Sequence, residues 1–274
     1  MTTGIRDAAR ATPCYDVRRV ALIEIRGVRK GFEDQQVLRG LDLDVHAGEF
    51  LTLIGGSASG KSLLLKIIMG LVPVDAGTLR FDGQEVTSLR EREWIAVRRR
   101  IGIQFQAGAL FDSLSVFDNV AYGLREQRVL AEPDIRQRVS ESLEQVSLPG
   151  IEAMWPSDLS GGMRKRVALA RAIALRPEVL LYDDPTEGLD PINVTRVNRL
   201  LLALRDRLHV TTVVVTHNMS SAFSISDRIA FLHEGRIAHT GTPQEMRALD
   251  DERLAPFVRA AGHSQLHRRA PSIV

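Results

Sequence analysis

The sequence predicts an α/β fold built on a largely parallel β-sheet, with a block of helices inserted into the chain. Short apolar stretches with strand-like patterns alternate with longer stretches of helical period, which is typical of βαβ units. Between about residue 107 and residue 176 helical patterns replace this alternation. The chain shows no internal repeat, so we expect a single copy of the unit.

The first part of the domain is expected to consist mainly of strands. Alternating or continuous apolar residues bounded by glycine or polar turns predict strands, and apolar residues at helical spacing predict helices. Strands are expected at 21–28, 37–45, 49–55, 76–83 and 101–106, and helices at 62–71 and 90–100.

The second part contains the helical block and the return to the sheet. Helices are expected at 115–127, 134–147, 161–175 and 193–208, and strands at 179–183, 210–217, 228–235 and 236–241, with a small helix after 217. We therefore divide the chain into a mobile leader at 1–19, one domain at 20–246 whose helical subdomain is 107–165, and a tail at 247–274.

Composition excludes several classes of protein. The 36 Lys and Arg residues nearly balance the 34 Asp and Glu residues, so we expect no nucleic-acid partner. Cys14 is the only cysteine, which excludes an internal disulfide and a cysteine-based zinc site. The longest apolar stretch, 63–74, is interrupted by Lys66 and is too short to cross a bilayer. The N-terminus lacks an export signal, so a cytoplasmic protein is expected.

One stretch, GGSASGKS at Gly55–Ser62, fits the pattern G-x-x-x-x-G-K-[ST]. It follows an apolar strand and opens a helix, which is the context that this motif requires. The glycines let the backbone curl so that N–H groups point at phosphate oxygens, and the helix N-terminus adds a positive dipole end. Lys61 is expected to reach the β- and γ-phosphates, and Ser62 to offer a hydroxyl to Mg²⁺. The stretch therefore predicts nucleotide binding.

Two adjacent acids lie at the end of the predicted strand 179–183. Asp183 is its last residue and Asp184 follows it. Taken alone, the two acids could bind a metal together, could transfer a proton, or could each have a different one of these roles. In phosphate-loop enzymes an acid at the end of a neighbouring strand holds the metal, which favours Asp183 as the Mg²⁺ ligand.

A second glycine turn opens the helix at 161–175. Ser160 is a predicted N-cap, and Gly161 and Gly162 follow it. The backbone amides at this helix start form a second anion site. Because the chain has two such helix starts and one phosphate loop, the simplest account is a pair of chains. Each nucleotide would lie between the 55–62 loop of one chain and the 160–162 turn of the other.

These motifs, in this order, resemble those of the nucleotide-binding subunit of an ABC transporter. The resemblance covers roughly residues 22–241, with Met163 where most members of the family have Gln. It implies a P-loop NTPase (RecA-like) core with an antiparallel β subdomain and an inserted helical subdomain. It also implies ATP and Mg²⁺ as ligands, and ATP hydrolysis coupled to transport.

The resemblance further implies roles for individual residues. Gln106 matches the residue that senses the γ-phosphate and metal and touches the membrane subunits, and His217 matches the switch histidine. Asp190 matches the contact to the opposite subunit, and Phe32 the aromatic that stacks on adenine. The expected catalytic residues are Lys61, Gln106, Asp184 and His217, and the expected metal ligands are Ser62, Gln106 and Asp183. The expected nucleotide-binding residues are Phe32, Gly55, Gly56, Ser57, Ala58, Ser59, Gly60, Lys61, Ser62, Leu63, Ser160, Gly161, Gly162 and Asp190.

A narrower resemblance concerns residues 105–126, FQAGALFDSLSVFDNVAYGLRE, together with LSGGM. Both are similar to the ATPases of Mla-type and Mce-associated lipid transporters. This implies a homodimer on the cytoplasmic side of the bacterial inner membrane, bound peripherally to a separate permease. A periplasmic MCE-domain protein and a small accessory subunit are the further partners that it implies.

Asp184 departs from the family pattern, which has Glu as the acid that positions the attacking water. It is then the base of a slower enzyme, or the backbone shifts to compensate, or the subunit binds ATP with little turnover; we favour the first. Glu187, three residues on, is not expected to substitute.

Rival functions stay open at this stage. They are an ABC ATPase for another cargo, a non-transport ATP-dependent switch, and a catalytically quiet ATP-binding scaffold. The simplest expectation for the tail is a disordered end. It contains Phe257, Val258 and the basic residues His267, Arg268 and Arg269. The alternative is docking on the neighbouring ATPase or an accessory subunit.

Overall fold

The computed structural model describes residues 21–33, 35–106, 108–128 and 130–262. Its main sheet has six strands in the order β10-β9-β3-β8-β7-β6. The strands are β3 (Phe50–Gly55), β6 (Ile101–Gln104), β7 (Val179–Asp183), β8 (Thr211–Val215), β9 (Arg228–His233) and β10 (Arg236–Gly241). Every neighbouring pair is parallel except β9 and β10. This arrangement confirms the predicted α/β fold with a largely parallel sheet.

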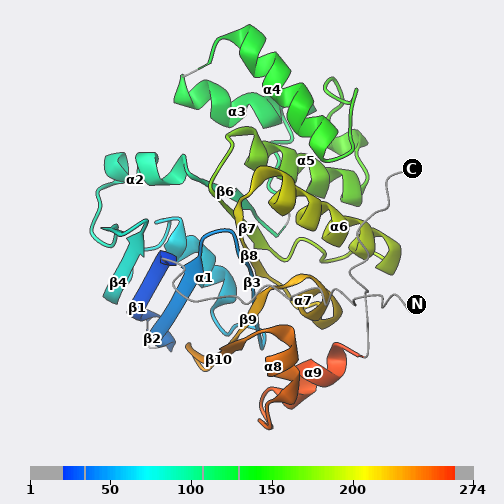
Figure 1. Cartoon of the computed structure of the whole chain (residues 1–274). Coiled ribbons are helices and arrows are strands. Elements are labelled where there is room, and N and C mark those ends of the chain that lie inside the picture. Colours follow the sequence, from blue (N-terminus) through cyan, green and yellow to red (C-terminus); the bar gives the residue numbers. More distant parts are fainter. Residues whose placement is uncertain (1–20, 34, 107, 129, 263–274) are drawn as a thin grey trace, which may run out of the picture.

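A second, antiparallel sheet lies beside the first and contains the N-terminal strands (Figure 1). Its order is β2-β1-β4-β5, with β1 (Ala21–Phe32), β2 (Gln35–His46), β4 (Ala76–Phe81) and β5 (Gln84–Glu85). Strand β1 pairs with both β2 and β4. The last residue of β1 is Phe32, so this sheet carries the predicted adenine-stacking residue.

The helices lie around the two sheets (Figure 1). They are α1 (Lys61–Ile68), α2 (Glu91–Arg98), α3 (Val116–Gln127), α4 (Glu132–Gln145), α5 (Gly161–Ala174), α6 (Pro191–Leu208), α7 (Met219–Ile225), α8 (Pro243–Ala248) and α9 (Ala255–Ala260), with a 3₁₀ turn at Pro156–Asp158. Helices α3, α4 and α5 pack on one another at one end of the molecule and form the inserted helical block. None of the helices in the described ranges is long and apolar enough to cross a membrane.

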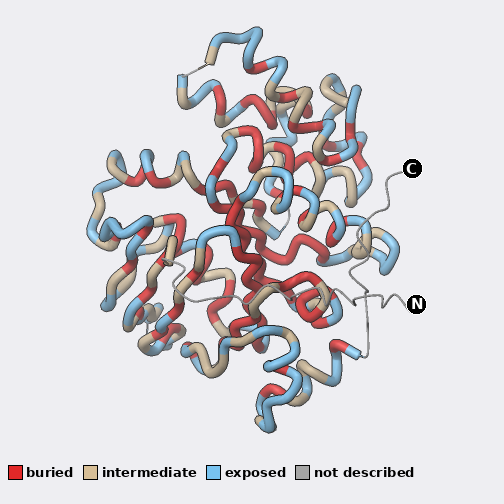
Figure 2. The backbone as a smooth tube through the Cα atoms, viewed as in Figure 1, coloured by how far each residue is buried: buried red, intermediate tan, exposed pale blue. Residues whose placement is uncertain are grey.

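The core centres on the parallel strands (Figure 2). All residues of β3, β7 and β8 are buried, as expected for strands covered on both faces. One apolar cluster joins the two sheets through α1, a second lies under α5 and α6, and a third lies under α7, α8 and α9. The carboxyl ends of β3, β7 and β8 are thereby fixed in a rigid layer.

Several boundaries differ from the sequence prediction, among them two helix ends whose shifts have identifiable reasons. Helix α1 ends at Ile68 instead of residue 71, because Gly70 has φ 63° and its Cα faces the Trp94 ring. A Cβ at Gly70 would lie 2.3 Å from that ring. Helix α4 begins at Glu132 instead of residue 134, because Pro133 fits the first turn of a helix.

Residues 247–262, part of the predicted tail, are folded onto the domain. Leu254 is fully buried in the third apolar cluster, and the rings of Phe257 and Phe231 lie 5.1 Å apart. The predicted leader, residue 107 at the start of the predicted helical subdomain, and the basic residues at 267–269 lie outside the described residues.

Candidate functional site

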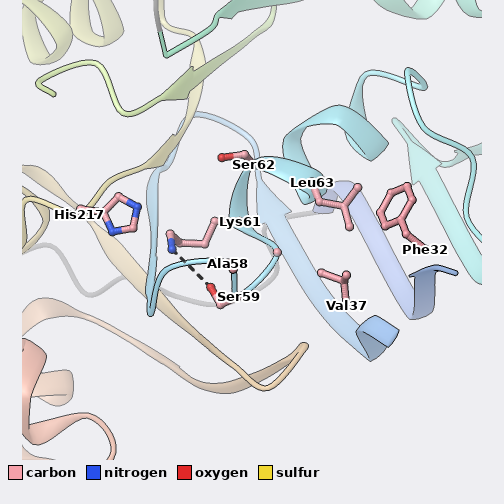
Figure 3. A pocket seen from close by; sticks show the side chains of 9 residues that line it. Phe32, Val37, Ala58, Ser59, Lys61, Ser62, Leu63 and His217 are labelled. Carbon is pink, nitrogen blue, oxygen red and sulfur yellow. Dashed lines mark hydrogen bonds between the residues drawn. The ribbon is translucent and has the colours of Figure 1, made fainter. Parts of the chain in front are cut away.

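A cavity of about 260 Å³ opens where the phosphate loop meets the antiparallel sheet. Its lining combines residues from β1, β2, the loop before α1, the start of α1, and the segment after β8. The lining residues are Phe32, Val37, Ala58, Ser59, Gly60, Lys61, Ser62, Leu63 and His217. In Figure 3, Lys61 and Ser62 lie between Phe32 on one side and His217 on the other. Most of the predicted nucleotide-binding residues of the phosphate loop therefore line one cavity with Phe32 and His217.

The loop from Gly55 to Gly60 connects β3 to α1 under tight steric constraints. Gly55 ends β3, and a Cβ there would lie 2.3 Å from the carbonyl oxygen of Leu232 on β9. Only glycine fits this close approach of two backbones. Helix α1 then begins without a side-chain cap from the described residues and without an acid in its first turn. Its N-terminal amides and positive dipole end suit an anion.

Lys61 is buried at the first position of α1, with only 4% of its surface exposed. Its Nζ donates to the carbonyl oxygens of Gly55 at 3.0 Å and Gly56 at 2.7 Å. Burial lowers the pKa of Lys61, and the nearby charges of Asp184 and Asp183 act in the opposite direction. The ammonium group is thus held over the loop, in position to contact phosphate oxygens.

Ser62 and Asp183 meet across the ends of α1 and β7. The Ser62 hydroxyl donates to Oδ1 of Asp183 at 2.8 Å. Burial raises the pKa of Asp183, although the bond from Ser62 opposes this shift. A hydroxyl beside a buried carboxylate is the oxygen-rich donor set that suits Mg²⁺, which is held by few protein ligands. Within the described ranges no cluster of three or more His, Cys, Asp or Glu side chains could hold a metal by itself.

Asp184, next to Asp183, is held by the segment that follows β8. Its Oδ1 accepts from the Thr216 hydroxyl at 3.1 Å and its Oδ2 from the backbone N–H of His217 at 3.2 Å. Its own N–H donates to the carbonyl oxygen of Val215 at 2.8 Å. Asp184 has φ 44°, a left-handed conformation that is uncommon for a residue other than glycine. The two neighbouring acids thus have different partners, Ser62 for Asp183 and Thr216 with His217 for Asp184.

Phe32 is 51% exposed, and the two residues before it are hydrogen-bonded to Asp75. The Asp75 carboxylate accepts from Lys30 Nζ and from the backbone N–H of Gly31, both at 2.7 Å. The Lys30 ammonium lies 5.4 Å from the centre of the Phe32 ring. The exposed ring is part of the cavity lining.

Gln106 and Glu187 lie apart from this cavity lining. Gln106 is exposed two residues beyond the end of β6. Glu187 is exposed in the turn after β7, where its N–H donates to the carbonyl oxygen of Asp184 at 3.2 Å. The structure therefore does not bring Gln106 into contact with Ser62 or Asp183 through any of the described interactions.

The second glycine turn, Ser160–Gly162, also lies outside the cavity lining. Ser160 is the N-cap of α5, and its Oγ accepts from the N–H of Met163 at 3.2 Å. A Cβ added at Gly162 would meet no atom within 4 Å among the described residues. The start of α5 is thus open around Gly162 and lies on a different part of the chain from the cavity lining.

Asp190 caps α6. Its Oδ1 accepts from the N–H groups of Ile192 and Asn193, each at 3.0 Å. Asn193 donates hydrogen bonds to this carboxylate from its backbone N–H and from its side-chain amide, and these bonds, the backbone one first, lower the pKa of Asp190. Within the chain this residue therefore has a structural partner, which sequence analysis did not predict.

Thr216 and Lys165 were not predicted from the sequence as residues of this site. The Lys165 ammonium on α5 donates to the carbonyl oxygen of Glu187, which ties the α5 helix to the turn that leads to Asp190. Arg171, also on α5, donates to the carbonyl oxygens of Gly108 at 2.9 Å and Ala109 at 2.7 Å. The only signal for Thr216 in the sequence is its position before His217, and Lys165 has no signal beyond its place in the motif helix.

Comparison with known proteins agrees with this geometry. The ABC transporter family profile matches residues 38–187. The intermembrane phospholipid transport system ATP-binding protein MlaF of Haemophilus influenzae is 38% identical over 251 residues, which is 92% of this chain and 95% of MlaF. The sulfate/thiosulfate import ATP-binding protein CysA of Xylella fastidiosa is 44% identical over 227 residues, 82% of this chain but 64% of CysA.

Solved structures give the same assignment. The dimeric post-hydrolysis structure of the ATP-binding cassette MJ0796, bound to ADP and Pi, has a TM-score of 0.75 and 30% identity, covering 81% of this chain and 98% of that one. A phosphate loop, a buried acid beside its serine, and a fold shared with ATP-hydrolysing cassettes support ATP binding and hydrolysis. The chain therefore belongs to the ABC transporter family, as an ATP-binding subunit that hydrolyses ATP.

Proposed function

We propose that this subunit energises the transport of phospholipid or another lipid across the bacterial envelope. Two copies would bind a separate permease on the cytoplasmic side of the inner membrane. The observation that carries the proposal is the match to MlaF, named for intermembrane phospholipid transport, over 95% of that protein's length. The match to CysA covers 64% of that protein, so the correspondence with a sulfate importer is less complete.

In this proposal each ATP lies between two subunits. One subunit supplies the phosphate loop, Lys61 and Phe32, and the other supplies the open Ser160–Gly162 turn. This division is supported by the placement of the turn outside the cavity lining of its own chain. The MJ0796 cassette is dimeric in its post-hydrolysis structure, which also supports a pair.

Ser62 and Asp183 would hold Mg²⁺, with Gln106 as a further ligand brought in when the subunits close. The 2.8 Å separation of the Ser62 hydroxyl and the Asp183 carboxylate fits such a site. When bound, the ion would neutralise charge on the β- and γ-phosphates. The exposed position of Gln106 requires its segment to move toward the metal.

For hydrolysis, Asp184 would orient the attacking water and accept its proton. His217 would orient the γ-phosphate, and Lys61 with the partner's turn would stabilise the developing charge. Loss of the γ-phosphate would weaken the closed pair, since both subunits contact it. The bonds of Arg171 to residues 108 and 109 offer a route from α5 to the segment after Gln106, which faces the permease in this proposal.

The cargo is tested by isolating the subunit with its native membrane partners. We expect a tagged chain, extracted from its host's membranes in detergent, to bring a permease and an MCE-domain protein, identified by mass spectrometry. Reconstituted in vesicles, this complex is expected to move a fluorescent phospholipid in an ATP-dependent manner. Recovery of a permease with a soluble sulfate- or polyamine-binding protein would overturn the lipid assignment and leave the ATPase intact.

The role of Asp184 is tested by steady-state ATPase rates of the wild type, Asp184→Asn and Asp184→Glu. A positioned general base contributes at least about 10²-fold to the rate. We expect Asp184→Asn to lose at least that factor in kcat while it still binds ATP. A wild-type rate in Asp184→Asn would show that Asp184 is not the base.

A further inference from the structure

We propose that Thr216 is a positioning residue for ATP hydrolysis, which fixes the carboxylate of Asp184 for its task. This inference rests on the proposed role of Asp184 as the water-orienting acid. Thr216 follows the last residue of β8 and directly precedes His217. Its hydroxyl donates to Oδ1 of Asp184 at 3.1 Å.

The direction of this hydrogen bond follows from the two partners of the Thr216 hydroxyl. The Thr216 Oγ1 accepts from the backbone N–H of Asn218 at 3.0 Å. A carboxylate accepts only, and a hydroxyl has one proton to give. The N–H of Asn218 therefore occupies a lone pair of the hydroxyl, and the hydroxyl proton points at Asp184.

Burial makes this contact hard to replace. Thr216 is 2% exposed and Asp184 is 5% exposed, so water has little access to either side chain. A hydrogen bond to a charged group is stronger than one between neutral groups, and a buried carboxylate oxygen without its donor loses that stabilisation. Thr216 and the N–H of His217 together bind both oxygens of Asp184.

The two donors link the acid to the switch histidine as one unit. They come from consecutive residues, and the second of these, His217, also lines the nucleotide cavity through its side chain. Aspartate has a shorter side chain than glutamate, so its carboxylate cannot reach as far from the backbone. The bond from Thr216 selects the side-chain rotamer of Asp184, and so determines where this short carboxylate points.

The test compares variants that remove the hydroxyl with one that keeps it. Thr216→Val replaces the hydroxyl by a methyl of similar size, and Thr216→Ala removes it without adding bulk. Both are expected to lower kcat about tenfold or more, while the KM for ATP changes less than twofold, since a hydrogen bond to a charged group is worth about a factor of ten in rate or more. Thr216→Ser keeps the donor and is expected to restore most of kcat.

Thr212→Val is the matched control on the same strand. The Thr212 hydroxyl is buried, 1% of the residue is exposed, and the hydroxyl has no hydrogen-bond partner among the described residues. Its loss is expected to leave kcat unchanged. Thermal unfolding and ATP binding of each variant confirm that the folded protein is being compared.

Three outcomes would overturn the proposal. These are a wild-type or higher kcat in Thr216→Val and Thr216→Ala, a loss in only one of them, or a loss that Thr216→Ser does not recover. A higher kcat would mean that Thr216 sequesters Asp184 instead of aiming it.

The background variant Asp184→Asn separates this inference from the role of Asp184 itself. In that background Thr216→Val is expected to cause no further loss, because the group that it positions is gone. If Asp184→Asn is inactive and Thr216→Val is not impaired, the positioning role alone fails. If Asp184→Asn keeps the wild-type rate, both the proposed role of Asp184 and the positioning role of Thr216 fail.

Discussion

The hydroxyl of Ser62 lies 2.8 Å from Oδ1 of Asp183, although 121 positions separate the two residues in the sequence. Asp183 is 7% exposed, and burial raises its pKa. A carboxylate in this environment is costly to ionise without a cation nearby. The proposed metal site therefore contains a carboxylate whose ionisation costs free energy when no cation is bound.

Removal of the Asp183 charge should stabilise the metal-free protein and abolish its response to Mg²⁺. Burial raises the pKa of Asp183 in the folded protein above the unfolded value of 3.8. Asp183 therefore carries no ionisation penalty below pH 3.8, and it destabilises the folded protein as the pH rises through its folded-state pKa and the carboxyl ionises. At pH 7 we expect Asp183→Asn to raise the Tm in chelator, by about 2–4 °C for each kcal/mol regained. The same variant should lose Mg²⁺-dependent ATPase activity. A lower Tm in chelator would contradict this account.

Mg²⁺ binding should weaken on acidification at a higher pH than for an ordinary aspartate. The proton and the metal compete for Asp183, and the raised pKa shifts this competition upward from 3.8. The effect would be measured by titrating the protein with Mg²⁺ at several pH values between 5 and 8, with the binding of a fluorescent ATP analogue as the readout. The binding of the analogue without metal, measured over the same range, is the control.

Loss of the Phe32 ring should weaken ATP binding with little effect on the chemical step. Stacking of a base on an aromatic ring contributes about 1–3 kcal/mol, so we expect Phe32→Ala to raise the KM for ATP by about tenfold. Phe32→Tyr should keep the wild-type KM, because it keeps the stacking surface. An unchanged KM in Phe32→Ala would exclude the ring from the adenine site.

Asp190 should have two separable roles. As the N-cap of α6 it is expected to contribute about 1 kcal/mol of stability, which Asp190→Ala removes and Asp190→Ser largely retains. A contact to the opposite subunit requires the carboxylate, so both variants should weaken ATP-dependent dimer formation. Light scattering in the Asp184→Asn background would measure the dimer, and thermal unfolding the cap. Normal dimer formation in Asp190→Ser would restrict Asp190 to the cap.

Leu254 should stabilise the domain without a part in catalysis. It is fully buried under α7, α8 and α9, so Leu254→Ala is expected to cost about 2–5 kcal/mol of unfolding free energy. Denaturant unfolding would measure this loss. Leu249→Ala is the matched control, because Leu249 is 40% exposed. A loss of less than 0.5 kcal/mol, about the usual range for surface substitutions, would show that this segment does not stabilise the domain.

The elements that sequence analysis predicted best are those with local signals. Strand β7 has the predicted bounds 179–183, because an apolar run meets two acids at its end. The predicted strand at 210–217 is shortened to Thr211–Val215, since Thr216 and His217 leave the ladder to bind Asp184. Helices α8 and α9 were not predicted, because six residues each give too little period to distinguish helix from loop.

The sequence by itself determined the phosphate loop, the order of the motifs and the alternation of strands and helices. These are properties of short segments, and each carries its own steric or hydrogen-bonding reason. Only the tertiary structure decided which distant side chains meet. The strand order β3-β8-β7 places Thr216 beside Asp184, and the packing of α1 against β3 and β7 places Ser62 beside Asp183. Strand order depends on crossover connections and the burial of both sheet faces, which are collective properties of the whole chain.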